Sequence, residues 1–389
     1  MSSPFNMPDE YVQGMFKAGQ SLLQALKPLQ SPHNEIAAPT RGAPLAELQM
    51  NYFQQQLALW TRMVAGGVGA ESQVAPERGD RRFNAPEWRD NPAYSLLKQA
   101  YLLNSRLVSD VVEAADLDDI TKHKLRFYAR QFVDAVSPAN FAATNPDVLK
   151  VALESKGESL RAGLENLLND MRKGGLTITD ESAFEVGKNV AVSEGAVVFE
   201  NELFQLIQYA PLTEKVASRP LVIVPPCINK FYILDLQPEN SFVRFALEQG
   251  QTVFLVSWRN PDASCGHVTW DDYLEQGAMK AIEVALAVSG TDKVNAVGWC
   301  VGGTILASAL AVMGARGDDS VASMTLLTTM LDFRDPGDLG VFIDEQGVSQ
   351  REQAIGQGGI YPGSELGFVF QTLRANDLIW PNVINNYLK

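Results

Sequence analysis

Histidine and cysteine are scarce in this sequence, with 3 of each among 389 residues. Three cysteines cannot build a disulfide framework, which predicts a reducing compartment, and we expect the cytoplasm. Basic residues are also outnumbered: 32 Lys and Arg stand against 46 Asp and Glu, for a net charge of −14. So acidic a chain lacks the basic footprint that nucleic acids require. Because it has neither a long apolar run nor a basic start followed by an apolar stretch, we expect no transmembrane segment and no signal peptide.

Helical periodicity dominates the first part of the chain. Residues 1–44 are rich in Gln, Pro and Ser, and we expect them to be loosely ordered apart from a short helix near Glu10–Leu26. Apolar residues at helical spacing predict longer helices beyond this stretch. These helices are expected over Leu45–Val64, Tyr94–Ala115, Leu117–Val136 and Glu158–Arg172. We therefore predict a helical N-terminal domain over residues 1–185.

Strands alternate with helices from about residue 186. This alternation predicts an α/β fold with a parallel sheet, whose first part spans residues 186–330. After residue 331 the alternation stops, and residues 331–389 are predicted to begin a cap or lid. The expected strands are a pair over Val197–Phe199 and Leu203–Tyr209, followed by the apolar runs Leu221–Val224, Thr252–Trp258, Lys293–Val297 and Val321–Thr328.

The strongest motif is Gly298-Trp-Cys-Val-Gly302, between a predicted strand and an Ala-rich helix. It has the G-x-nucleophile-x-G form of the α/β-hydrolase nucleophile elbow, with Cys300 in the place of serine. The nucleophile of such an elbow occupies a sharp turn, where side chains on the flanking glycines would collide with backbone. The alternative is a buried cysteine in a glycine-rich turn.

A thiol at this position suits nucleophilic catalysis. The N-terminus of the following helix favours the thiolate, which would attack a carbonyl and form an acyl-enzyme thioester. The oxyanion needs backbone N–H donors, which we expect from Val301 and from Ile228 in the loop after Leu221–Val224. This loop could equally be a turn stiffened by its two prolines.

The sequence offers no evident general base for the Cys300 nucleophile. In this fold the acid and the histidine follow the nucleophile, but His33, His123 and His267 all precede Cys300. His267 could substitute as base, although ordering of its own loop is the simpler interpretation. His123 is predicted to be a surface residue of a helix, and Asp332 either an acid or a turn residue.

Several sequence blocks together resemble one family, the poly(3-hydroxyalkanoate) synthases. An aromatic residue before Cys300 and Val-Gly-Gly-Thr after it resemble the class I, short-chain type. The blocks are Gly79-Asp-Arg-Arg-Phe83 with Trp88 and Asn91-Pro92, Leu97–Leu102, Val224–Lys230 with Tyr232–Pro238, Val256–Pro261, and Gly298–Thr304.

The resemblance implies polymerisation of (R)-3-hydroxyacyl-CoA, typically 3-hydroxybutyryl-CoA, into an intracellular polyester. Cys300 would carry the growing chain as a thioester, with the N–H groups of Ile228 and Val301 as oxyanion hole, and neither a metal nor a cofactor. The helical domain would serve granule association and contacts with a second copy or with granule-associated proteins. We therefore expect a homodimer at the surface of polyester granules.

The family places its catalytic Asp and His well downstream, so the general base and acid are assigned to no residue here. We therefore expect the chain to be C-terminally incomplete, with its own activity open. Two alternatives remain: a cysteine hydrolase or thioesterase, and a non-catalytic partner of a full-length synthase.

The remaining charged and thiol residues carry weaker hypotheses. Lys230 and Arg259 could steer an anionic substrate. Arg81-Arg82 could meet CoA phosphates, although a salt-bridged surface loop is the simpler interpretation. The other two cysteines, Cys227 and Cys265, lack the spacing of metal ligands.

Overall fold

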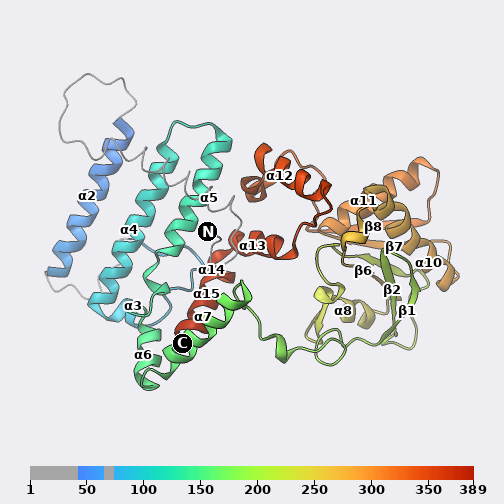
Figure 1. Ribbon diagram of the computed structural model, residues 1–389, viewed down its shortest axis with the longest axis horizontal. Helices are drawn as coiled ribbons and strands as arrows, with labels where there is room; N and C mark the ends of the chain where they lie inside the picture. Colours follow the sequence, from blue (N-terminus) through green and yellow to red (C-terminus); the bar gives the residue numbers. More distant parts are fainter. Residues whose placement is uncertain (1–42, 65–73) are drawn as a thin grey trace. The chain divides into compact units, whose positions relative to one another are not determined.

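A computed structural model describes residues 43–64 and 74–389 (Figure 1). The predicted helix near Glu10–Leu26, the loose order of residues up to 42, and His33 lie outside the described residues. Contacts divide the described chain into two compact units. Unit 1 comprises the described residues up to Ile178 with Gly337–Gln350 and Pro362–Lys389, and unit 2 comprises Thr179–Pro336 with Arg351–Tyr361.

Unit 1 is helical. Its four long helices are α2 (Ala43–Val64), α4 (Pro92–Ala114), α5 (Asp119–Ala135) and α7 (Glu158–Lys173), which confirm the predicted helices. None of the described helices is long and apolar enough to cross a bilayer. The shorter elements are α3 (Glu87–Asp90), η2 (Pro138–Asn140), α6 (Pro146–Glu154), η7 (Gly337–Phe342), α13 (Gly363–Leu373), α14 (Ala375–Leu378), α15 (Trp380–Val383) and the π-helix η8 (Ile384–Leu388); α12 (Glu345–Gly356) spans residues of both units.

The C-terminal helices pack within unit 1. The Tyr387 hydroxyl of η8 donates to the buried carboxylate of Asp170 on α7, at 2.5 Å. A Cβ on Gly163 of α7 would lie 2.0 Å from the carbonyl oxygen of Tyr387, so the two helices are in backbone contact. Residues 362–389 therefore belong to the helical unit, and the cap role of 331–389 stays a prediction.

Arg82 is the centre of a partly buried charge cluster in unit 1. Its guanidinium contacts Asp80 at 2.9 Å, Asp134 at 3.2 Å and the Tyr101 hydroxyl at 2.8 Å. Both carboxylates are largely buried. Arg82 is thus committed to an internal ion pair, as expected from the salt-bridge interpretation, while Arg81 is exposed.

Replacing Arg82 should destabilise unit 1. Arg82→Met would leave two buried carboxylates without their cation, which costs about 3 kcal/mol of unfolding free energy. Urea denaturation followed by circular dichroism measures this loss. The matched control is Arg89→Met, which removes an exposed pair with Asp90 and should leave the midpoint unchanged. Equal midpoints for the two variants would contradict the structural role of Arg82.

Unit 2 contains the predicted sheet, with six strands among the described residues. β6, β3, β7 and β8 run parallel, and β2 and β1 continue the sheet antiparallel beyond β6. This confirms the predicted parallel sheet and strand pair. In spatial order the strands are β1 (Gly195–Glu200), β2 (Phe204–Tyr209), β6 (Val253–Trp258), β3 (Leu221–Val224), β7 (Val294–Trp299) and β8 (Val321–Leu327); β4 (Asp235–Gln237) and β5 (Asn240–Ser241) form a separate pair.

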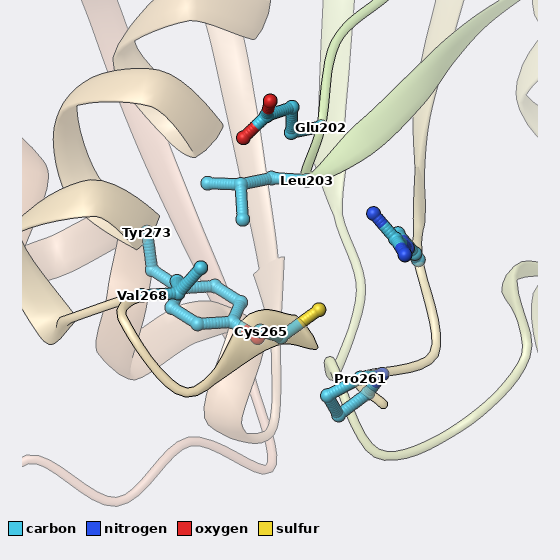
Figure 2. Close-up of a pocket in the computed structure, with 7 residues that line it drawn as sticks. Glu202, Leu203, Pro261, Cys265, Val268 and Tyr273 are labelled. Atoms are coloured by element: carbon cyan, nitrogen blue, oxygen red, sulfur yellow. The ribbon is translucent and has the colours of Figure 1, made fainter. Parts of the chain in front are cut away.

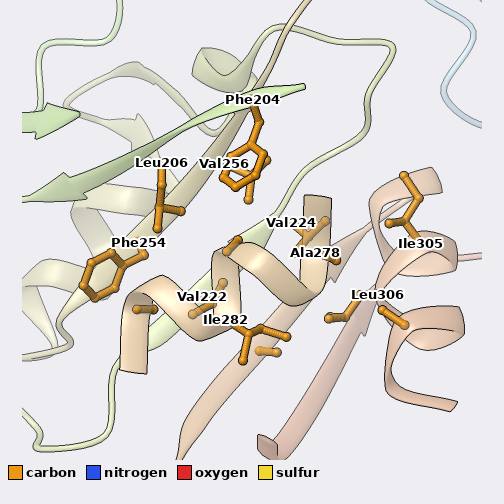
Figure 3. Packing of buried hydrophobic residues seen from close by; sticks show 14 of the residues in the cluster. Phe204, Leu206, Val222, Val224, Phe254, Val256, Ala278, Ile282, Ile305 and Leu306 are labelled. Carbon is orange, nitrogen blue, oxygen red and sulfur yellow. The ribbon is translucent and has the colours of Figure 1, made fainter. Parts of the chain in front are cut away.

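Alternate residues of the central strands serve two buried layers. Val222 and Val224 of β3 pack with the helices α10 (Lys280–Ser289) and α11 (Val301–Ala315) on one face (Figure 3). Ile223, between them, packs with α8 (Phe242–Glu248) on the other face. Because side chains alternate across a strand, burial on both faces explains the continuous apolar run of β3.

The helix that begins after Thr269 changes type in its middle. Thr269 and Asp272 form a capping box at its start, and the helix is divided into α9 (Trp270–Asp272), the π-helix η6 (Tyr273–Met279) and α10. Gly277 of η6 lies against the ring of Trp258, and a Cβ there would be 2.8 Å from a ring carbon. The widened turn thus sits where the helix passes closely over an indole.

Candidate functional site

Cys300 lies between β7 and α11, in the sharp turn that the motif predicts. Its backbone has φ 53° and ψ −127°, a conformation that residues with a side chain seldom adopt. The Cys300 N–H donates to Leu327 O of β8 at 2.9 Å, and its carbonyl accepts from Gly303 N at 2.9 Å. Both bonds hold the strained turn in place.

Three glycines let the turn close. A Cβ on Gly298 would lie 2.4 Å from Gly303 Cα, and one on Gly302 would lie 2.2 Å from Val224 O. A Cβ on Gly303 would lie 2.0 Å from the Thr329 hydroxyl oxygen. The requirement at Gly298 and Gly302 matches the sequence argument. The sequence alone does not predict the contact of Gly303 with Thr329, although a third glycine directly after the motif is a signal of close packing there.

Helix α11 begins at Val301, directly after the nucleophile, so its first turn contains Gly302 and Gly303. Two adjacent glycines disfavour a helix at this position, because glycine has a low helix propensity. Close packing overrides that propensity in the structure. Val301 is the first residue of the helix, so its N–H has no intrahelical acceptor and is available to an oxyanion at Cys300.

The loop after β3 leaves the sheet at the same edge as Cys300. β3 and β7 are parallel neighbours, and Val224 is paired with Gly298. The loop and Cys300 follow these two residues directly, so the register brings them to one end of adjacent strands. The side chain of Ile228 is 42% exposed. The two proposed donors, Ile228 and Val301, thus belong to neighbouring segments of one sheet edge.

Cys227 lies in the same loop and, like Val301, packs against the buried cluster on the α10 and α11 face of the sheet. Burial, reinforced by the negative charge of a nearby Cys300 thiolate, raises the pKa of the Cys227 thiol above its usual range. Cys227 is therefore protonated at neutral pH and is a poor competing nucleophile.

This pKa shift predicts the pH dependence of alkylation. In a Cys300→Ala variant, burial still acts on Cys227, so the iodoacetamide rate at Cys227 should rise with a midpoint above the ordinary thiol pKa of about 8.5. Mass spectrometry of the Cys227 peptide across pH measures this rate. A midpoint at or below the ordinary value would contradict the assigned effect of burial.

None of the candidate acid–base residues has a described contact with Cys300. Nδ1 of His267 lies 3.0 Å from Ser264 O, and its Nε2 lies 4.0 Å from Glu202. Asp332 binds Arg334, two residues further along the chain. His123 belongs to unit 1, where its Nε2 lies 3.4 Å from Asp338. These contacts agree with the structural interpretation of each residue.

A small cavity of ≈ 190 Å³ lies beside the end of β6 (Figure 2). Arg259 lines it but is paired with Asp262 at 2.9 Å, which offsets the charge proposed to steer a substrate. Lys230 precedes the 3-10 helix η4 (Phe231–Leu234) on the surface. In the described part of the chain no cluster of acidic, His and Cys side chains could hold a metal ion. The cavity is lined by Glu202, Leu203, Arg259, Pro261, Cys265, Val268 and Tyr273.

Comparison with known proteins decides the family. Residues 79–246 match the sequence model described as poly-beta-hydroxybutyrate polymerase (PhaC) N-terminus, and residues 220–388 match that of the alpha/beta hydrolase fold. The chain belongs to the poly(3-hydroxyalkanoate) polymerase family. This confirms the resemblance in sequence and the predicted α/β-hydrolase fold.

Relatives in this family match most of the chain. It is 54% identical over 352 residues to the poly(3-hydroxyalkanoate) polymerase subunit PhaC of Cupriavidus necator, covering 89% of this chain and 59% of that protein. It is 43% identical over 350 residues to the poly(3-hydroxyalkanoate) polymerase of Methylorubrum extorquens, covering 88% and 58%. The chain thus spans about three fifths of the length of these polymerases.

Proposed function

We propose that this polymerase-family chain accepts a hydroxyacyl group from a CoA thioester onto Cys300, as the first step in building a polyhydroxyalkanoate. The observation that carries the proposal is the strained turn at Cys300, with φ 53°, between a buried strand and a helix N-terminus. Backbone strain of this kind is kept where function requires it. The substrate in this proposal is an (R)-3-hydroxyacyl-CoA, with 3-hydroxybutyryl-CoA first.

The acylation step follows from the groups around the turn. The Cys300 thiolate attacks the thioester carbonyl, and the carbonyl oxygen becomes an oxyanion. The N–H groups of Val301 and Ile228 donate to this oxyanion. Collapse of the tetrahedral intermediate breaks the C–S bond to CoA, which leaves as a thiolate and takes a proton from solvent. The acyl group remains on Cys300 as a thioester.

A thiol nucleophile suits a thioester substrate. Exchange between two thioesters changes bond energy little, so loading of Cys300 is reversible and the acyl group stays activated for the next transfer. The next transfer requires a proton to leave the hydroxyl of an incoming unit. We assign that proton to no described residue. The proposal includes a homodimer located at the surface of polyester granules, with contacts to granule-associated proteins.

Product analysis tests the proposed function. The 389-residue chain is incubated with (R)-3-hydroxybutyryl-CoA, and released CoA, free acid and polyester are measured separately. CoA release with acyl groups retained on protein or in polymer supports the proposal. CoA release matched by free 3-hydroxybutyrate indicates a thioesterase instead. Absence of CoA release over a no-protein control contradicts acylation and favours a non-catalytic partner.

A further inference from the structure

We infer that Trp258 is a positioning residue that fixes the oxyanion loop against the nucleophile turn. Its indole Nε1–H donates to Pro225 O at 2.8 Å, in a buried hydrogen bond between the end of β6 and the loop after β3. Pro225 lies three residues before Ile228, the proposed donor. The inference rests on the proposed acylation of Cys300.

The indole itself is held on several sides. The ring centroid of Phe204 lies 6.0 Å and that of Tyr273 5.4 Å from the Trp258 ring. Gly277 of η6 closes a further side, because a Cβ there would lie 2.8 Å from ring carbon Cη2. π-helical turns occur frequently at functional sites, and this one brings Gly277 onto the indole. The N–H of Trp258 therefore points in a fixed direction.

The nucleophile turn contacts the same carbonyl group. A Cβ on Gly302 would lie 2.4 Å from Pro225 O and 2.5 Å from Pro225 C, so the first turn of α11 packs directly on it. Pro225 O thus lies between the indole of Trp258 and the residue that follows Val301. One carbonyl links the two segments that carry the proposed donors.

The prolines transmit this restraint along the loop. Pro225 and Pro226 each have a fixed φ and no N–H to donate, so the start of the loop depends on its carbonyl contacts. Loss of the indole bond would leave the buried Pro225 carbonyl unsatisfied and let the loop shift. A displacement of Ile228 relative to Val301 would weaken an oxyanion hole without touching the Cys300 thiol.

Two reactions of Cys300 separate this role from general stability. Acetylation by p-nitrophenyl acetate passes through an oxyanion: the thiolate forms the acetyl thioester and p-nitrophenolate leaves. Alkylation by iodoacetamide displaces iodide and forms no oxyanion. In Trp258→Phe, which keeps an aromatic ring but lacks the N–H, acetylation should fall about 10- to 100-fold. Alkylation of the Cys300 peptide should stay within about twofold of wild type, because the thiol environment is unchanged.

Leu247→Ala is the matched control, because it removes buried packing on the other face of the sheet and leaves the indole and its N–H bond untouched. It should lower thermal stability comparably, with near wild-type acetylation. Equal acetylation rates in Trp258→Phe and Leu247→Ala, or a parallel fall of acetylation and alkylation in Trp258→Phe, would overturn the inference alone. A wild-type chain that takes acetyl but not hydroxybutyryl groups would overturn the proposed substrate and leave the Trp258 comparison valid. A wild-type chain that takes no acetyl group on Cys300 would overturn both.

Discussion

Cys300→Ala should abolish acyl transfer from (R)-3-hydroxybutyryl-CoA, lowering the rate of CoA release by roughly 1,000-fold or more. The reason is chemical rather than structural. Without the thiol no covalent intermediate forms, and water must attack the thioester directly. Since alanine fits any space that cysteine occupies, the turn should keep its fold. Stopped-flow detection of free CoA thiol measures the effect.

Cys265→Ala provides the control for Cys300→Ala. It removes a thiol on the same unit, at the cavity beside β6, that the proposed chemistry does not use. CoA release should stay within about twofold of wild type, because no step passes through this sulfur. Comparable losses in the two variants would contradict the assignment of Cys300 as the sole acceptor.

Gly302→Ala should lower acylation by about 100-fold and destabilise unit 2 by about 3 kcal/mol. A Cβ there would lie 2.2 Å from Val224 O and 2.4 Å from Pro225 O. These are backbone atoms, so no side-chain rotation relieves the clash. Either the start of α11 or the end of β3 must move, and each carries a proposed oxyanion donor. Thermal unfolding and the acetylation rate of Cys300 measure the two effects.

Gly314→Ala is the matched control within the same helix. A Cβ on Gly314 meets nothing within 4 Å, so alanine should stabilise α11 by about 0.5 kcal/mol and leave acylation unchanged. Comparing the two variants separates the effect of the backbone clash at Gly302 from the effect of replacing a helical glycine by alanine. If Gly302→Ala behaved like Gly314→Ala, the packed turn would not be what fixes the donors.

The sequence carried enough information to predict the strands and the turn. Leu221–Val224 could be recognised because a strand buried on both faces is apolar at every position, and the structure places it at the centre of the sheet. The glycines around Cys300 could be interpreted because a sharp turn brings backbone segments too close together to leave room for a Cβ. In both cases the residues themselves reflect a constraint that acts at their own positions.

Contacts between residues distant in sequence could not be predicted. Nothing near Trp258 indicates that its N–H meets Pro225, 33 residues earlier. The packing of Gly303 on Thr329 depends on β7 and β8 being neighbours, which periodicity does not reveal. Likewise, the polar residue Asp170 gave no sign that it would bind Tyr387 of the last helix. Such pairings are set by tertiary packing.

Location of the acyl group tests the central claim most directly. The chain is incubated with (R)-3-hydroxybutyryl-CoA, quenched in acid, digested, and analysed by peptide mass spectrometry. We predict a hydroxybutyryl group on the peptide that contains Cys300, removed by neutral hydroxylamine as a thioester would be. An acyl group found on another residue, one that resists hydroxylamine, or none at all would contradict the proposed function.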